Sequence, residues 1–281
     1  MLDIYRPRPR KSGLATPVRN RYFYGKLLDV YHFELETDYF NQKRWLHNRV
    51  ILGWGVVCGL DVKIGSQEDT IYVTPGVAID GWGREIIVPE DSHPISLLPG
   101  SHGRPQRSQT HAGENEQAQE SSQQQENNTK QKSPSPNHEF DVHVVLCYHE
   151  CESDPVPVRA GDCETADPCA PGAVREQYAI YIREGHLDPP DYSECDIPHV
   201  ISGGGLDYDA LVKWVTSGCP ELAYDPCVPL ANIHVVVEDE GRHCHPDEID
   251  ITVRPIVYSN ELLYQLLLAL LVEPRGYRRG R

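Results

Sequence analysis

Four cysteines close together in the sequence have the residue types needed to bind a metal ion. Four thiolates, or three with a histidine, would complete a tetrahedral zinc site and would tie down a loop with little hydrophobic content. Their spacing contains no Cys-x-x-Cys pair. A structural zinc, loop disulfides formed in an oxidising compartment, and free thiols are therefore all open. The candidate ligands are Cys147, Cys151, Cys163 and Cys169, with His143 and His149 nearby.

Two further groups of candidate ligands lie nearer the C-terminus. His243, Cys244 and His245 are consecutive in a predicted turn, where adjacent residues rarely all point at one ion. Cys219 and Cys227 bracket a short proline-containing loop, which fits either a disulfide or half of a zinc site. Neither pattern is specific.

Signatures of common catalytic sites are missing from the sequence. The run Ser202 to Gly205 resembles a phosphate-binding loop, but no Gly-Lys-Ser/Thr follows it. There is no Gly-x-Ser-x-Gly elbow, and the many carboxylates offer no pair that sequence alone places together. We therefore expect a protein that is not an enzyme, with a metal-dependent hydrolase using the Cys/His loop as an alternative.

The charge of the chain is strongly negative and unevenly spread. The 281 residues have a formal net charge of -16, which argues against nucleic-acid binding. Both ends are nevertheless basic. Such arms on an acidic body suit head-to-tail docking between subunits, although solubility with two loose tails explains them equally well. The basic residues are Arg6, Arg8, Arg10, Lys11, Arg19, Arg21 and Lys26 at one end, and Arg275, Arg278, Arg279 and Arg281 at the other.

Neither a membrane span nor a signal peptide is predicted. The most apolar stretch, Leu262 to Val272, is shorter than the roughly 20 residues that cross a bilayer. The N-terminal residues lack the apolar core of a signal peptide. We expect synthesis in the cytoplasm, where nine cysteines are many and metal binding or free thiols are favoured over disulfides.

Composition and periodicity divide the chain into five parts. Residues 1–20 form an extended basic arm, and residues 21–100 form a helix followed by a β module. Residues 101–138 are a Gln/Ser-rich insertion that cannot bury enough surface to offset its ordering entropy. Residues 139–258 are β-rich and contain the Cys-rich loop, and residues 259–281 form a C-terminal helix and basic tail.

The first half predicts an aromatic helix and a meander of short strands. Helical spacing of apolar residues covers about His32 to Val50, and Gly53 ends it. The module from Gly53 to Val88 alternates short strands with tight connections, because glycine permits positive φ and close approach. The corner glycines are Gly53, Gly55, Gly59, Gly76, Gly81 and Gly83.

The second half predicts more strands and two helices. Strands are expected at Phe140–Tyr148, Tyr178–Arg183, Val228–Glu238 and Ile249–Arg254, with loops at His149–Pro171 and Pro189–Gly205 and a turn near Gly241. Leu206–Ser217 is a short helix, and Ser259 caps a last helix to about Val272. At about 2 kcal/mol per buried leucine, this last helix must be covered by the core or a neighbour.

The predicted fold is mixed and mainly β (α+β), a short-strand meander or sandwich with an N-terminal aromatic helix and a C-terminal Leu-rich helix. The two helices and the preceding aromatic run are the predicted assembly interface. Its residues are Tyr22, Phe23, Tyr24, Phe33, Tyr39, Phe40, Trp45, Leu263, Leu267 and Leu271.

Several of these stretches resemble proteins encoded with phage-tail-like contractile injection systems. The similar stretches are Arg21–Leu28, Phe33–Glu36, Tyr39–Phe40, Gly53–Leu60, Val73–Gly81, Gly83–Ile86, Cys147–Tyr148, Glu150–Cys151, Asp154–Val158 and Ile182–Gly185. The pattern Gly-Val-Val-x-Gly-Leu followed by Pro-Gly-x-Ala-x-x-x-Gly-Arg is also similar to the start of many phage baseplate and tail-fibre proteins. No catalytic residue is carried over by this resemblance.

The resemblance implies an accessory structural component of such a particle, at the baseplate or its fibres or extension. It would be present in several copies, bind other subunits, and belong to an intracellular or released particle, apposed to a membrane only through partners. The alternative in another class is a carbohydrate- or surface-binding module in which Trp54, Trp82 and exposed tyrosines stack on sugars.

Overall fold

A computed structural model describes most of the chain. The described residues are 14–67, 69–97, 138–157, 169–190, 200–202, 205–219, 221–238 and 243–271. The Gln/Ser-rich stretch 101–138 lies outside them apart from its last residue, as do Cys163, the turn near Gly241 and the basic C-terminal tail.

The first element is the predicted aromatic helix. Helix α1 (Val30–His47) is capped by Asp29, whose carboxylate accepts a hydrogen bond of 3.2 Å from the backbone N–H of His32. It continues as a short π-helix, η1 (Asn48–Leu52), and Gly53 ends it with a positive φ of 85°. The prediction for this helix is confirmed, with its start two residues earlier than expected.

The module after Gly53 consists of two small antiparallel sheets. The strands are β1 (Gly55–Gly59), β2 (Val62–Ile64), β3 (Thr70–Val73), β4 (Gly76–Ile79), β5 (Glu85–Val88) and β6 (Ile95–Ser96). One sheet has the order β1-β4-β5 and the other β2-β3-β6. The predicted meander is right for the consecutive pairs β2–β3 and β4–β5. It is wrong between β3 and β4, which lie in different sheets.

A larger four-stranded sheet forms the second half of the body. It contains β7 (His138–Pro157), β8 (Cys169–Glu184), β11 (Val228–Glu238) and β12 (His243–Asp250) in the order β12-β11-β7-β8. The expected extent of β11 is confirmed. Strands β7 and β8 are much longer than predicted, because residues 149–157, expected in a loop, pair with residues 169–177. Residues 169–171 belong to the same predicted loop. His243 to His245 also lie in a strand rather than in a turn.

The other elements are short. Strands β9 (Ile201–Ser202) and β10 (Gly205–Leu206) pair before helix α2 (Tyr208–Thr216), which Asp207 caps. Helix α3 (Asn260–Leu271) is capped by Ser259, whose hydroxyl accepts a hydrogen bond of 3.2 Å from the N–H of Leu262. Both predicted helices in this half are confirmed.

One hydrophobic core joins the three larger sheets. Its fully buried side chains come from the N-terminal module, such as Leu60, Ile71 and Ile86, and from the large sheet, such as Leu146 and Leu230. The two halves of the chain therefore fold as one β body. The prediction of a mixed, mainly β fold is confirmed.

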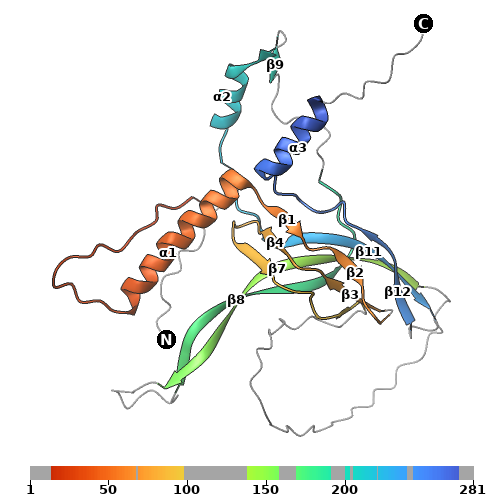
Figure 1. Ribbon diagram of the computed structural model, residues 1–281, viewed down its shortest axis with the longest axis horizontal. Coiled ribbons are helices and arrows are strands. Elements are labelled where there is room, and N and C mark those ends of the chain that lie inside the picture. Colours follow the sequence, from red (N-terminus) through yellow and green to blue (C-terminus); the bar gives the residue numbers. More distant parts are fainter. Residues whose placement is uncertain are drawn as a thin grey trace.

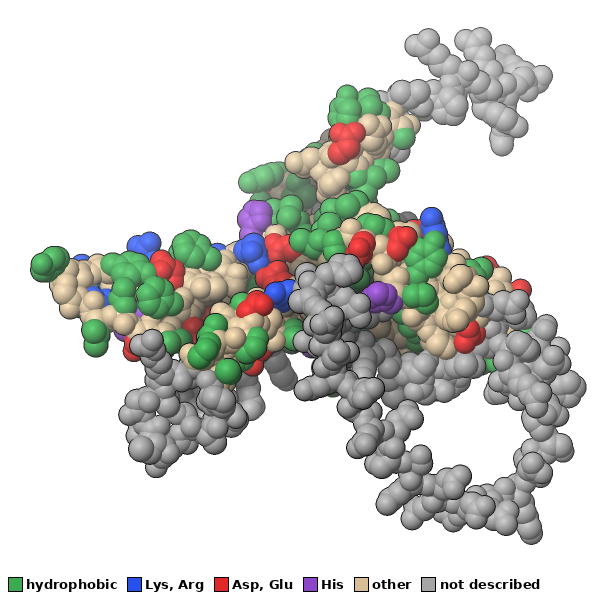
Figure 2. Space-filling view, turned by 60° about the horizontal axis from the view of Figure 1, so that its bottom comes forward, with side chains coloured by type: hydrophobic (Ala, Val, Ile, Leu, Met, Phe, Trp, Pro, Cys, Tyr) green, Lys and Arg blue, Asp and Glu red, His purple; other side chains and the backbone are tan. Residues whose placement is uncertain are grey.

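Helices and a hairpin extend from this β body in Figure 1. Helix α1 projects to one side, the outer part of the β7–β8 hairpin projects below it, and α2 and α3 stand above the sheets. Figure 2 shows hydrophobic side chains over these projections as well as over the body.

Candidate assembly interface

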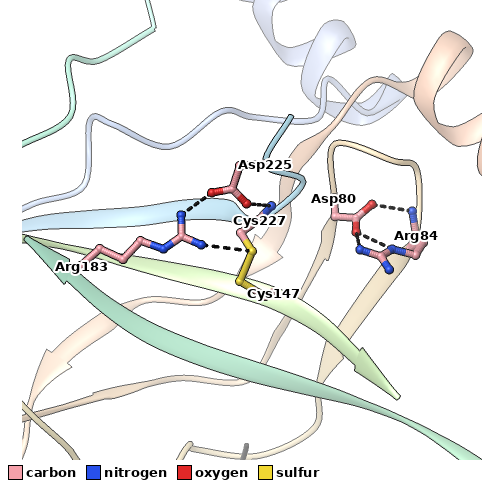
Figure 3. The surroundings of a disulfide bond; sticks show 6 residues. All are labelled: Asp80, Arg84, Cys147, Arg183, Asp225 and Cys227. Carbon is pink, nitrogen blue, oxygen red and sulfur yellow. Dashed lines mark hydrogen bonds and ion pairs between the residues drawn. A yellow bond between two sulfur atoms is a disulfide. The ribbon is translucent and has the colours of Figure 1, made fainter. Parts of the chain in front are cut away.

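Two cysteines form a disulfide across neighbouring strands. Because Val228 pairs with Leu146 in the β11–β7 register, Cys227 lies opposite Cys147, with 4.5 Å between their Cα atoms. This separation is in the range that a disulfide bridges, and Figure 3 shows the bond. This cross-strand disulfide is none of the pairings that the sequence left open, since it joins one cysteine of the predicted cluster to Cys227 outside it.

The predicted zinc site is corrected by this bond. Cys147 is bonded to Cys227 and is not a free thiolate, and Cys151 and Cys169 are unpaired on the β7–β8 hairpin. Within the described ranges, no three Cys, His, Asp or Glu side chains gather closely enough to hold a metal ion. The sequence missed the pairing because the register of β7 against β11, which selects Cys227 over Cys219, is set by the whole sheet.

Charged groups hold the segment around Cys227 against the sheet. Nη1 of Arg183 on β8 forms an ion pair with the carboxylate of Asp225. Nη2 of the same arginine lies 3.7 Å from the sulfur of Cys227. Burial by itself would raise the pKa of Asp225, but the hydrogen bonds from Arg183 and from the N–H of Cys227 outweigh it and lower this pKa. Asp225 therefore holds in place the residues that lead into β11 (Figure 3).

A buried ion pair fixes the turn between β4 and β5. Asp80 is fully buried and accepts hydrogen bonds of 2.8 Å and 2.7 Å from the backbone N–H and the side-chain Nε of Arg84. The guanidinium carbon of Arg84 lies 4.8 Å from the Trp82 ring centre and 4.5 Å from that of Tyr148. The turn therefore packs directly on β7.

Trp82, one of the two tryptophans considered for sugar stacking, is used in this packing. Its indole N–H donates a hydrogen bond of 3.0 Å to the carbonyl of Ala223. The Arg84 guanidinium lies over its ring. The ring therefore serves the fold.

Two of the six predicted corner glycines show why no side chain fits. A Cβ on Gly83, where φ is +91°, would lie 2.1 Å from the carbonyl oxygen of Trp45 in α1. A Cβ on Gly55 would lie 2.3 Å from the carbonyl oxygen of Pro255. Both glycines let distant segments approach the module, which supports their expected role as scaffold residues.

The N-terminal arm, defined as residues 14–47, exposes apolar side chains that a monomeric protein usually buries. None of the 18 residues of α1 is buried. The segment before the helix, residues 14–29, contacts the helix, because the Tyr22 hydroxyl donates a hydrogen bond to the carboxylate of Glu36. Aromatic side chains on both parts are exposed, at 57% for Phe33, 62% for Phe40 and 64% for Phe23.

The structure brings most predicted interface residues of the arm onto this surface. Tyr22 and Tyr24 are exposed like the three phenylalanines, while Tyr39 and Trp45 are half-buried. Such a run of exposed aromatic rings is typical of the buried centre of protein–protein interfaces.

The sequence predicts that helix α3 is covered either by the core or by a neighbouring subunit. The core does not cover it. Leu263 and Leu267 are 44% and 57% exposed, and Leu266 and Leu268 are exposed too. The side chain of Leu271 lies outside the described residues. Among the described helices, none combines the length and apolar character that crossing a bilayer requires.

The sequence did not predict that the outer part of the β7–β8 hairpin projects from the body. Strand β11 pairs with β7 only from His138 to Leu146, so the pairs from His149–Gln177 to Pro157–Cys169 form a two-stranded ribbon. Both faces of its outer half are exposed, including Val156 and Val174. An ion pair of 2.9 Å between Arg175 and Asp154 links its strands. A two-stranded ribbon is marginally stable alone, which points to further contacts.

Comparison with known proteins adds no assignment. No family model matches the chain, and the search of curated proteins gives no significant match. The functional argument therefore rests on the residues and their arrangement.

Proposed function

We propose that this chain is a structural subunit of a phage-tail-like contractile injection particle, at the baseplate or its fibres or extension. It acts by binding neighbouring subunits and not by catalysis. The observation that carries the proposal is the N-terminal arm, whose 18-residue helix has no buried residue and whose aromatic side chains are largely exposed. The sequence resemblance supplies the kind of particle.

Energetics support a partner for the arm. Most helical stability in proteins comes from packing one apolar face against other elements, and no side chain of α1 is buried in this way. Burying three exposed phenylalanines contributes several kcal/mol in an interface, at about 2 kcal/mol each. The uncovered leucines of α3 and the two-stranded ribbon call for neighbours by the same reasoning.

Purified particles provide the first test. The chain should be detected by mass spectrometry in particles that contain sheath and baseplate proteins, at a stoichiometry above one copy per particle. If it is absent while those proteins are present, the proposal fails.

Substitutions on the arm provide the second test. Phe33→Ser with Phe40→Ser should lower incorporation into particles by about tenfold or more, because interface aromatics carry much of the binding energy. Neither side chain is buried in the chain itself, so the thermal midpoint of the purified variant should hardly change. Ile64→Ser with Ile87→Ser is the matched control, since these side chains are 54% and 60% exposed but lie on the β body, outside the arm, α3 and the β7–β8 ribbon.

The carbohydrate-binding alternative has one observation in its favour. Trp54 is 41% exposed and lines a shallow pocket. Asp188 is the one charged side chain among the residues lining it, whereas a sugar ring needs several hydrogen-bonding partners. A glycan array that gives binding lost in Trp54→Ala would favour this alternative over assembly.

A further inference from the structure

The pocket beside Trp54 has the chemistry of a peptide-binding groove. It has a volume of about 300 Å³, is open to solvent and is mostly apolar. Its lining residues, called the Trp54 groove below, are Trp54, Leu187, Asp188, Pro190, Pro229, Val253 and Pro255.

Both walls of the Trp54 groove are held in place by hydrogen bonds. The buried side chain of Asn232 accepts a bond of 3.0 Å from the N–H of Leu187 and donates one of 2.8 Å to the carbonyl of the same residue. On the other wall, Pro255 accepts a bond of 2.8 Å from the N–H of Val56. The groove is therefore formed before any ligand arrives, which lowers the entropic cost of binding.

The lining indicates the class of ligand. A tryptophan surrounded by prolines binds proline-containing extended peptides through apolar contacts that need few hydrogen bonds. The exposed carboxylate of Asp188 favours a cationic side chain, and the face of Trp54 favours the same group through a cation–π contact. An extended peptide in which arginine and proline alternate satisfies all three conditions.

The chain itself contains a run of alternating arginine and proline before its first described residue. The described structure begins at Leu14, and the preceding residues include the run Arg6-Pro7-Arg8-Pro9-Arg10. This run carries three positive charges, while the whole chain has a formal net charge of -16. Its charge and composition complement those of the Trp54 groove.

We propose that the Trp54 groove of one copy binds the Arg6–Arg10 segment of a second copy. This contact is head-to-tail, so it generates a ring or an open row of subunits depending on the angle between neighbours. It deepens the proposed assembly function by naming a second copy as partner. Its tests use the purified full-length chain, so its failure would leave the particle membership of the chain untouched.

Charge reversal on each side tests the contact. Asp188→Lys, and separately Arg6→Glu with Arg8→Glu and Arg10→Glu, should each weaken self-association measured by sedimentation equilibrium by about tenfold. Mixing the two variants should restore association between unlike chains, since the residue 6–10 segment of each chain then meets a groove of opposite charge. Asp91→Lys, which reverses another exposed aspartate, is the control and should associate like the wild type.

The tryptophan contributes a second, apolar test. Trp54→Ala should weaken self-association, while Trp214→Ala, which removes an indole of similar exposure, should not. A synthetic peptide of residues 1–13 in excess should dissociate the wild-type oligomer, and the same peptide with both prolines changed to alanine should do so less well.

Three results would overturn the proposal. The first is a wild-type chain that stays monomeric at high concentration, as it would if the segment bound its own groove. The second is unchanged association of the Asp188→Lys chain. The third is failure of the two charge-reversed chains to associate when mixed.

Discussion

At the residue scale, most of the unusual side chains serve the fold. Cys147 and Cys227 join two strands, Asp80 and Arg84 fix a turn, and Asp225 anchors a strand entry. The residues that resemble a site by type are thus mainly structural. The exposed aromatic side chains, which carry no reactive group, are the better candidates for function.

Loss of the disulfide should destabilise the chain measurably. The bond closes a loop of 80 residues, and the chain-entropy model assigns about 4 kcal/mol to a loop of this size. Cys147→Ser should therefore lower the free energy of unfolding by about 3 to 5 kcal/mol in urea titrations without reductant. The wild type in dithiothreitol should behave like the variant.

An unpaired cysteine gives the control for this experiment. Cys58→Ser should leave the urea midpoint close to that of the wild type, because Cys58 is exposed and free. If mass spectrometry after alkylation finds Cys147 and Cys227 labelled in unreduced, denatured protein, the bond is not formed.

His234 should titrate above its usual range. The hydrogen bond from its ring to Asp141, at 2.8 Å, raises the pKa of His234, and the nearby charges of Glu139 and Asp247 act in the same direction. A raised pKa in the folded state stabilises the folded chain below the unfolded value of about 6.5. This contribution disappears as the pH rises through the folded pKa.

An NMR titration of the histidine ring protons measures this effect. One resonance should titrate above 6.5, disappear in His234→Gln, and move back toward 6.5 in Asp141→Asn. A resonance that does not respond to Asp141→Asn would contradict the assigned cause. In urea, the wild type should exceed His234→Gln in stability by more at pH 6 than at pH 8.5.

At the element scale, local signals in the sequence located most helices and strands. They failed for residues that form a strand only because another segment pairs with them. Gly53 and Ser259 mark helix ends through conformations that depend only on near neighbours, so those predictions held. Asp29 caps α1 in the same local way but was not predicted. The outer parts of β7 and β8 contain prolines and cysteines typical of loops. They form strands because each supplies the other with backbone partners, which no local pattern reveals.

The candidate interface was predictable in part for the same reason. Aromatic residues at helical spacing mark α1, but the same pattern fits a core helix as well as an interface helix. The exposure of the aromatic side chains distinguishes an interface helix from a core helix. That exposure depends on how far the β body extends along the helix, which the sequence pattern does not show. Trp54 and Asp188 come together only through the fold, so the groove they line has no signal in the sequence.

The contact between α1 and the β body depends on Gly83. Gly83→Ala should destabilise the chain by more than Gly185→Ala, by about 1 kcal/mol or beyond, in urea unfolding. Both glycines have φ near +90°, but only the Cβ on Gly83 would meet backbone atoms of α1. The matched pair thus separates backbone strain from the contact itself. Equal losses would mean that α1 does not rest on this turn.

At the scale of the whole molecule, a well-packed β body carries elements that it does not cover. The core joins three sheets and buries residues such as Leu60, Ile71 and Leu230 completely. Helix α1, helix α3 and the outer β7–β8 ribbon contribute little to it. This division is expected of a subunit whose body folds alone and whose projections are completed by neighbours.

Hydrogen exchange should separate these two kinds of element and detect the neighbours. In the purified chain, the amides of α1 should exchange much faster than those of β11, because local opening of a helix without buried residues costs little. In assembled particles α1 should become protected, since its aromatic face is then covered, while β11 should change little. Protection of α1 in the isolated chain equal to that of β11 would contradict an uncovered arm. Fast exchange of α1 in both states would mean that the arm is not the surface through which this chain assembles.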